Sequence, residues 1–67
     1  MNDFDVSQFM EEDEFDGQGD TWEGALEAAY ENAKARGHGP GWYKVKHWWV
    51  RMESPISEHK VIVKAGG

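Results

Sequence analysis

The sequence predicts a single small α+β domain with the order strand, helix, strand, strand (βαββ), in which one helix packs on one face of a three-stranded antiparallel sheet. Three observations carry this prediction. Apolar residues recur at helical spacing between Asp20 and Arg36. Two segments of alternating polarity, residues 42–52 and 58–65, follow the helix. The turn that joins them is too short for a crossover, so these two strands run antiparallel.

The helix is the best-defined element of the sequence. Asp20 is expected to cap its first turn, and Glu23 completes a capping-box pattern. Gly37, which follows Lys34 and Arg36, is expected to end the helix in the left-handed conformation. The apolar face of the helix consists of Trp22, Ala25, Leu26, Ala29 and Ala33.

An acidic strand is expected before the helix, at about residues 12–17, with Gly17-Gln18-Gly19 as the turn into the helix. Acidic residues are poor strand formers. The later strands, however, carry lysines, and opposite charges on neighbouring strands stabilise a sheet. The domain therefore spans residues 11–67, and residues 1–10 form an N-terminal arm with Phe4, Phe9 and Met10. This arm is either a flexible tail or a segment that docks on a neighbouring subunit.

Composition restricts the function classes. A chain of 67 residues has a marginal core, and its four Trp, two Tyr and three Phe are more than one small sheet and one helix can bury. We therefore expect a homo-oligomer. The formal net charge of −6 argues against nucleic acid and anionic membranes as partners. No apolar run is long enough for a membrane span, and the first residues lack the pattern of a secretory signal, so a cytoplasmic protein is expected.

Alternation along the last two strands separates two faces of the sheet. With Trp49 opposite Val61 and Trp48 opposite Ile62, the odd-numbered residues form the more apolar face, which is expected to pack on the helix. The even-numbered face mixes aromatic and cationic side chains, so a flat aromatic ligand with negative charge would suit it. A subunit interface without a ligand is the alternative. The expected ligand-binding residues on this face are Trp42, Lys44, Trp48 and Lys60.

Catalytic and metal chemistry find little support in the sequence. The chain has no cysteine, and His47 and His59 lack a third metal ligand at usable spacing. Ser57 and His59 are accompanied by neither a nucleophile elbow nor an orienting acid. The acidic residues before the helix do not follow the spacing of a calcium loop. We therefore expect a binding protein and not an enzyme, with no metal site.

The order of strand, capped helix, glycine turn, Gly41-Trp42-Tyr43-Lys44-Val45 and His59-Lys60-Val61-Ile62-Val63-Lys64 resembles the dodecin family. Dodecins form hollow dodecamers that bind riboflavin-type flavins without catalysis. The resemblance implies that Trp42 stacks on the isoalloxazine ring of FMN or riboflavin. Lys60 stands where the family has a glutamine that hydrogen-bonds the ring, and this replacement removes an acceptor. The resemblance thus implies a flavin-storing oligomer of dodecin-like fold.

A second similarity lies at the start of the helix. Gly19-Asp20-Thr21-Trp22-Glu23-Gly24-Ala25-Leu26 is similar to the Gly-Asp-Thr-x-Glu-x-Ala-Leu box of HicB-type antitoxins. That family places several strands before the box, whereas only nineteen residues precede Asp20 here. The similarity supports an alternative function, in which a small acidic protein binds and inhibits a macromolecular partner. A pure oligomerisation module is the third possibility.

Overall fold

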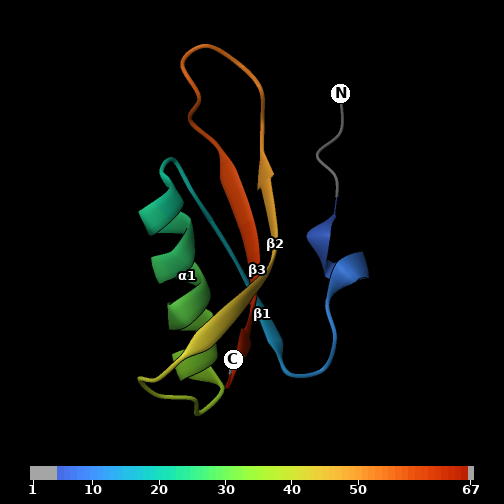
Figure 1. The fold of residues 1–67 in the computed structure, drawn as a ribbon, viewed down its shortest axis with the longest axis vertical. Helices are drawn as coiled ribbons and strands as arrows, with labels where there is room; N and C mark the ends of the chain where they lie inside the picture. Colours follow the sequence, from blue (N-terminus) through green and yellow to red (C-terminus); the bar gives the residue numbers. More distant parts are fainter. Residues whose placement is uncertain (1–4, 67) are drawn as a thin grey trace.

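The computed structural model describes residues 5–66 and confirms the predicted βαββ order (Figure 1). A short 3-10 helix precedes the domain, while Phe4 of the predicted arm lies outside the described residues. No helix in the described range is long and apolar enough to cross a membrane. The elements are η1 (Val6–Phe9), β1 (Glu14–Gly19), α1 (Trp22–Ala35), β2 (Tyr43–Val50) and β3 (His59–Ala65).

The three strands form one antiparallel sheet in the order β1-β3-β2, so β3 lies in the middle. β1 begins and ends two residues later than predicted, because Gly17-Gln18-Gly19 belongs to the strand and is not a turn. The expected pairing of charges is present: Glu14 lies opposite Lys64, and Asp13 Oδ2 lies 3.9 Å from Lys64 Nζ. Opposite charges therefore contribute to holding this acidic strand against β3.

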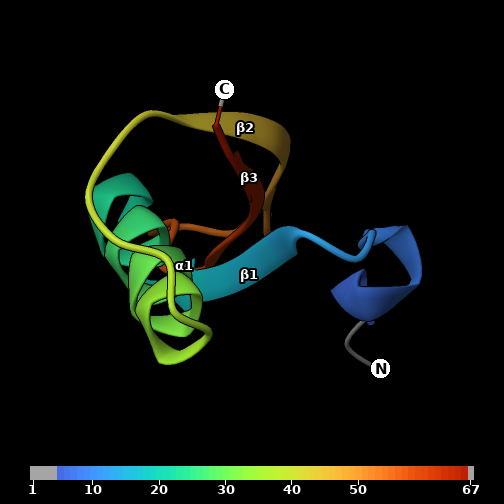
Figure 2. The same ribbon diagram turned by 90° about the horizontal axis from the view of Figure 1, so that it is seen from below.

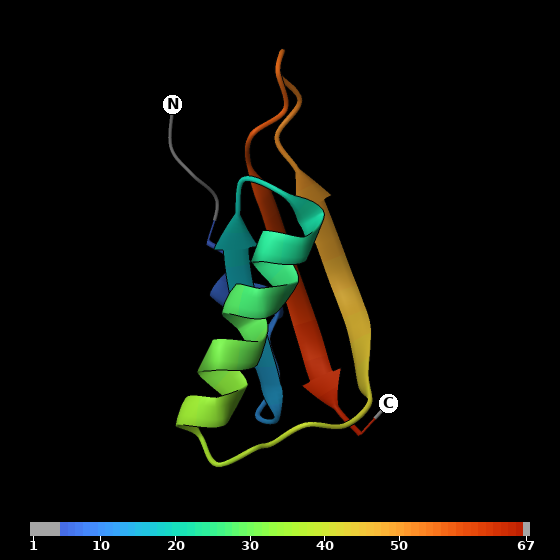
Figure 3. The same cartoon turned by 90° about the vertical axis from the view of Figure 1, so that its left-hand side faces the viewer.

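Two glycines of β1 determine where α1 sits. Gly17 and Gly19 face the helix, and a Cβ atom on either would clash with the helix backbone. Ala25, Ala29 and Ala33 present an equally small surface from the helix side and are fully buried. These residues allow the two backbones to approach closely, so α1 packs on β1 and β3 while β2 lies beside it (Figure 3).

The helix begins one residue later than predicted. Thr21, and not Asp20, is the N-cap, because its Oγ1 accepts a hydrogen bond from the Gly24 amide at 2.9 Å. The predicted capping box of Asp20 with Glu23 is therefore wrong. Thr21 is the N-cap because its backbone is extended and places its side chain over the first turn of the helix. At the other end, Gly37 has φ of 91° and confirms the left-handed helix end.

A β-bulge in β2 corrects the predicted register and faces. Val45 lies opposite Val63, but His47 lies opposite Ile62, so Lys46 is the extra residue. Beyond the bulge, Trp48 lies opposite Val61 and not opposite Ile62. The odd-numbered residues of β2 thus face the helix before Lys46, and the even-numbered ones do so after it. Simple alternation along the whole strand was wrong for this reason.

The N-terminal segment lies on the side of the sheet opposite α1 (Figure 2). We call this side of the sheet, which α1 does not cover, the open face. The Phe9 ring lies 5.8 Å from that of His47 and 5.3 Å from that of Trp49, between centroids. His47 is directly opposite Ile62, which is fully buried although it faces away from the helix. The described part of the arm therefore packs against its own chain and shields Ile62.

Candidate functional site

An apolar hollow of about 490 Å³ lies between α1 and the first half of β2. The hollow exists because the small residues of β1 let the helix pack close to β1, which leaves β2 uncovered. Ring contacts between α1 and β2 bridge the two elements at both ends, Tyr30 with Tyr43 and Trp22 with Trp48. The residues that line the hollow are Leu26, Tyr30, Pro40, Gly41, Trp42, Tyr43, Val45 and Val63.

Trp42 forms one end of this hollow and is the most exposed large apolar side chain in residues 5–66, at 88%. Its backbone is held in place, since the Trp42 carbonyl accepts a hydrogen bond from the Gly66 amide at 2.9 Å. The neighbouring Tyr43 hydroxyl donates to the Gly39 carbonyl at 2.7 Å and fixes the loop that precedes the strand. An indole on a fixed backbone, with its faces in solvent, is suited to stack on a planar ring.

The lining of the hollow is uncharged. A cation lies beside one of the lining residues: Lys34 Nζ is 5.0 Å from the Tyr30 ring centroid. Lys34 also pairs with Glu31 at 3.1 Å, and this hydrogen bond raises the pKa of Lys34. Glu31 therefore balances this charge, and the lining of the hollow itself carries none.

The structure separates the residues that were expected to form one site. Lys44 and Lys60 lie on the open face, where Lys44 is opposite Lys64, and Lys60 is opposite Gln18 and Trp49. Trp42 lines the hollow on the helix side instead. Trp42 precedes the first residue of β2, so strand alternation does not fix its face, and its place in the lining of the hollow separates it from Lys60.

Trp48 is on the helix side but at the far end of β2 from Trp42. Its ring centroid lies 4.3 Å from that of Trp22, and its Nε1 donates to His59 Nδ1 at 3.4 Å. The bulge at Lys46 places Trp48 there and away from the lysines of the open face. Trp48 remains 52% exposed, so it belongs to the same uncovered strip of β2 as Trp42 without sharing its hollow.

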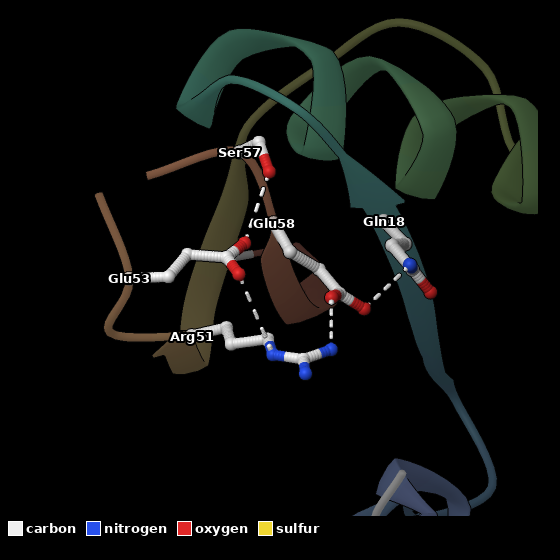
Figure 4. A network of polar contacts seen from close by, with 5 residues as sticks. All are labelled: Gln18, Arg51, Glu53, Ser57 and Glu58. Atoms are coloured by element: carbon white, nitrogen blue, oxygen red, sulfur yellow. Dashed lines mark hydrogen bonds and ion pairs between the residues drawn. The ribbon is translucent and has the colours of Figure 1, made fainter. Parts of the chain in front are cut away.

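His47 and His59 occupy opposite faces of the sheet, and the described residues contain no cluster of three metal-ligating side chains. A polar network instead secures the base of the loop between β2 and β3 (Figure 4). Arg51 pairs with Glu58 at 3.4 Å, and Glu58 accepts from Gln18 at 2.9 Å. Ser57 donates to Glu53 at 3.0 Å. These contacts make Ser57 a structural residue of the loop.

Sequence reasoning missed most of the hollow. Leu26 and Tyr30 are four residues apart and therefore share a helix face, which was a usable signal. Val45 was assigned to a helix-covered face, and only the displacement of α1 toward β1 leaves it 39% exposed.

No family model, curated protein or solved structure matches this chain.

Proposed function

We propose that this chain is a non-enzymatic, self-associating binding protein that takes a flat, neutral aromatic ligand in the hollow beside Trp42. The single observation that carries the proposal is the exposed Trp42 indole at the end of an apolar hollow with no charged residue in its lining. Ligand sites are mostly apolar concavities with a few oriented groups, and stacking on an indole adds specificity for planar rings.

A flavin is the ligand to test first, because the resemblance to dodecins also assigns Trp42 to ring stacking. The geometry changes one expectation that the lysines had suggested. Lys60 lies on the open face and cannot attract the phosphate of a flavin held beside Trp42. We therefore expect riboflavin and FMN to bind with similar affinity, with little dependence on salt.

The experiment is a fluorescence titration of riboflavin and FMN with the wild-type protein, Trp42→Ala and Lys60→Gln. Stacking on an aromatic ring is worth roughly 1–3 kcal/mol, so Trp42→Ala should weaken binding about tenfold or more. Lys60→Gln is the matched control on the open face and should leave binding unchanged. A wild-type protein that does not quench flavin fluorescence would refute the flavin proposal. Loss of FMN binding in Lys60→Gln alone would place the site on the open face.

A further inference from the structure

The apolar surface that α1 leaves uncovered forms a strip along β2 and its two continuations. Its members are Trp42, Val45, Trp48 and Met52, which are 88%, 39%, 52% and 82% exposed. The exposed parts of the two tryptophans alone amount to roughly 350 Å² per chain if a full indole side chain offers about 250 Å². Two copies would bury roughly 700 Å² through them, more than half of the ~1,200 Å² at which specific interfaces begin.

The two edges of the sheet differ in how they are covered. At the β1 edge, the Asn32 side chain of α1 donates a hydrogen bond to the Asp16 carbonyl. β2 pairs only with β3 in the described part of the chain, and α1 does not lie over it (Figure 3). An uncovered edge strand is a template for adding another strand. β2 is therefore the edge at which this sheet can be extended.

The β2 strand of a second copy can pair antiparallel with this one, so that the last residue of one strand lies opposite the first residue of the other. This register matches the two strands both in the polarity of the paired residues and in the face of the sheet on which they lie. The pairs would be Tyr43 with the partner's Val50, Lys44 with the partner's Trp49, Val45 with the partner's Trp48, and Lys46 with the partner's His47. Because the bulge shifts alternation at the middle of the strand, Tyr43, Val45, Trp48 and Val50 all face the helix side. This register thus joins apolar to apolar and sets no two Lys or Arg side chains directly opposite.

The same edge resists other pairings. Lysines and a bulge on an edge strand discourage unspecific strand addition. Shifting the second copy by two residues toward its loop sets Lys44 opposite the partner's Arg51, where like charges destabilise the pair. In that shifted register, the bulge also places a residue that faces the helix side opposite a residue that faces the open side. The charges and the bulge therefore disfavour this shifted register relative to the one that pairs the whole strand.

We propose that a second copy of this chain docks antiparallel along β2 in this register and closes the hollow beside Trp42. Just beyond the paired strands, Trp42 would lie opposite the partner's Arg51, and Gly41 opposite the partner's Met52. Even-numbered residues beyond the bulge face the helix side, so the thioether of the partner's Met52 would stand beside the loop as part of the missing wall of the hollow. The role of this wall in holding a ligand rests on the proposed function, whereas the pairing of the two strands does not.

Cysteine pairing tests the register directly, because the natural chain has no cysteine. Residues opposite one another in antiparallel strands lie within disulfide reach, whereas residues several positions apart do not. Mixing Val45→Cys with Trp48→Cys under mild oxidation should give several-fold more covalent dimer than either variant alone. Val45→Cys mixed with Glu27→Cys, an exposed position on the outer side of α1, is the control and should give only background.

Two further measurements keep the result decisive. Lys46→Cys mixed with His47→Cys uses exposed positions and serves if Trp48→Cys does not fold. Light scattering of the wild-type protein gives the mass without any substitution. A one-chain mass at micromolar concentration, or a dimer in which both cysteine mixtures match the control, would overturn the docking proposal. Crosslinking without flavin quenching would uphold the docking and refute the ligand. Quenching by a one-chain species would do the reverse.

Discussion

Gly17→Ala probes the feature that creates the hollow, the close contact between β1 and α1. A Cβ at residue 17 would lie 2.9 Å from Ala29 Cα and closer still to the Ala25 carbonyl oxygen and the Ala29 amide nitrogen. Carbon atoms in contact are normally about 3.5–4.0 Å apart, so the helix must retreat by roughly 1 Å. The obstacle is backbone, which cannot rotate away as a side chain can.

The expected loss follows from that displacement. Overpacking a core costs about 1–3 kcal/mol, and a clash against helix backbone belongs at the upper end of this range. A domain of this length has roughly 3–10 kcal/mol of stability in total. Gly17→Ala should therefore lower the urea midpoint strongly or prevent folding. Gly39→Ala is the matched control, since a Cβ there meets nothing within 4 Å. Equal midpoints for the two variants would refute the account of how α1 is positioned.

Two further substitutions test the helix start and the arm. Thr21→Ala should destabilise the protein by about 1 kcal/mol through loss of the N-cap, whereas Asp20→Ala should change the urea midpoint much less; the opposite order would restore Asp20 as the cap. Phe9→Ala should cost about 1 kcal/mol, because a half-buried aromatic ring loses its contacts with His47 and Trp49 and uncovers Ile62. An unchanged thermal midpoint and unchanged tryptophan emission would mean that the arm does not hold this position in solution.

The helix and its buried face could be predicted because the spacing of Ala25, Ala29 and Ala33 fits only a helix that buries one face. The N-cap was harder, since Asp20 and Thr21 are adjacent and both cap helices well. Gly17 and Gly19 were ambiguous for a different reason. Glycine marks both turns and close backbone approaches, and the facing alanine stripe was the signal that could have decided between them.

The candidate site was less predictable than the fold. The excess of aromatic residues indicated that some of them would stay exposed, and Trp42 and Trp48 are exposed. The separation of Trp48 from Lys44 and Lys60 depends on one bulge residue, Lys46, for which the sequence carries no marker such as glycine. A bulge exchanges the faces of every residue beyond it, so an otherwise sound alternation argument gave the wrong neighbours for Trp48.

Hydrogen exchange along β2 tests most directly the central claim that this uncovered strand is the binding surface of the protein. The outward-facing amides of Tyr43–Val50 should exchange rapidly in dilute solution, because β3 protects only the inward-facing ones. Their protection should rise with protein concentration, and riboflavin should further protect the segment around Trp42, Tyr43 and Val45. Amides of His59–Ala65, in the centre of the sheet, serve as the internal control. Rapid exchange of the outward β2 amides at every protein and riboflavin concentration would contradict the claim.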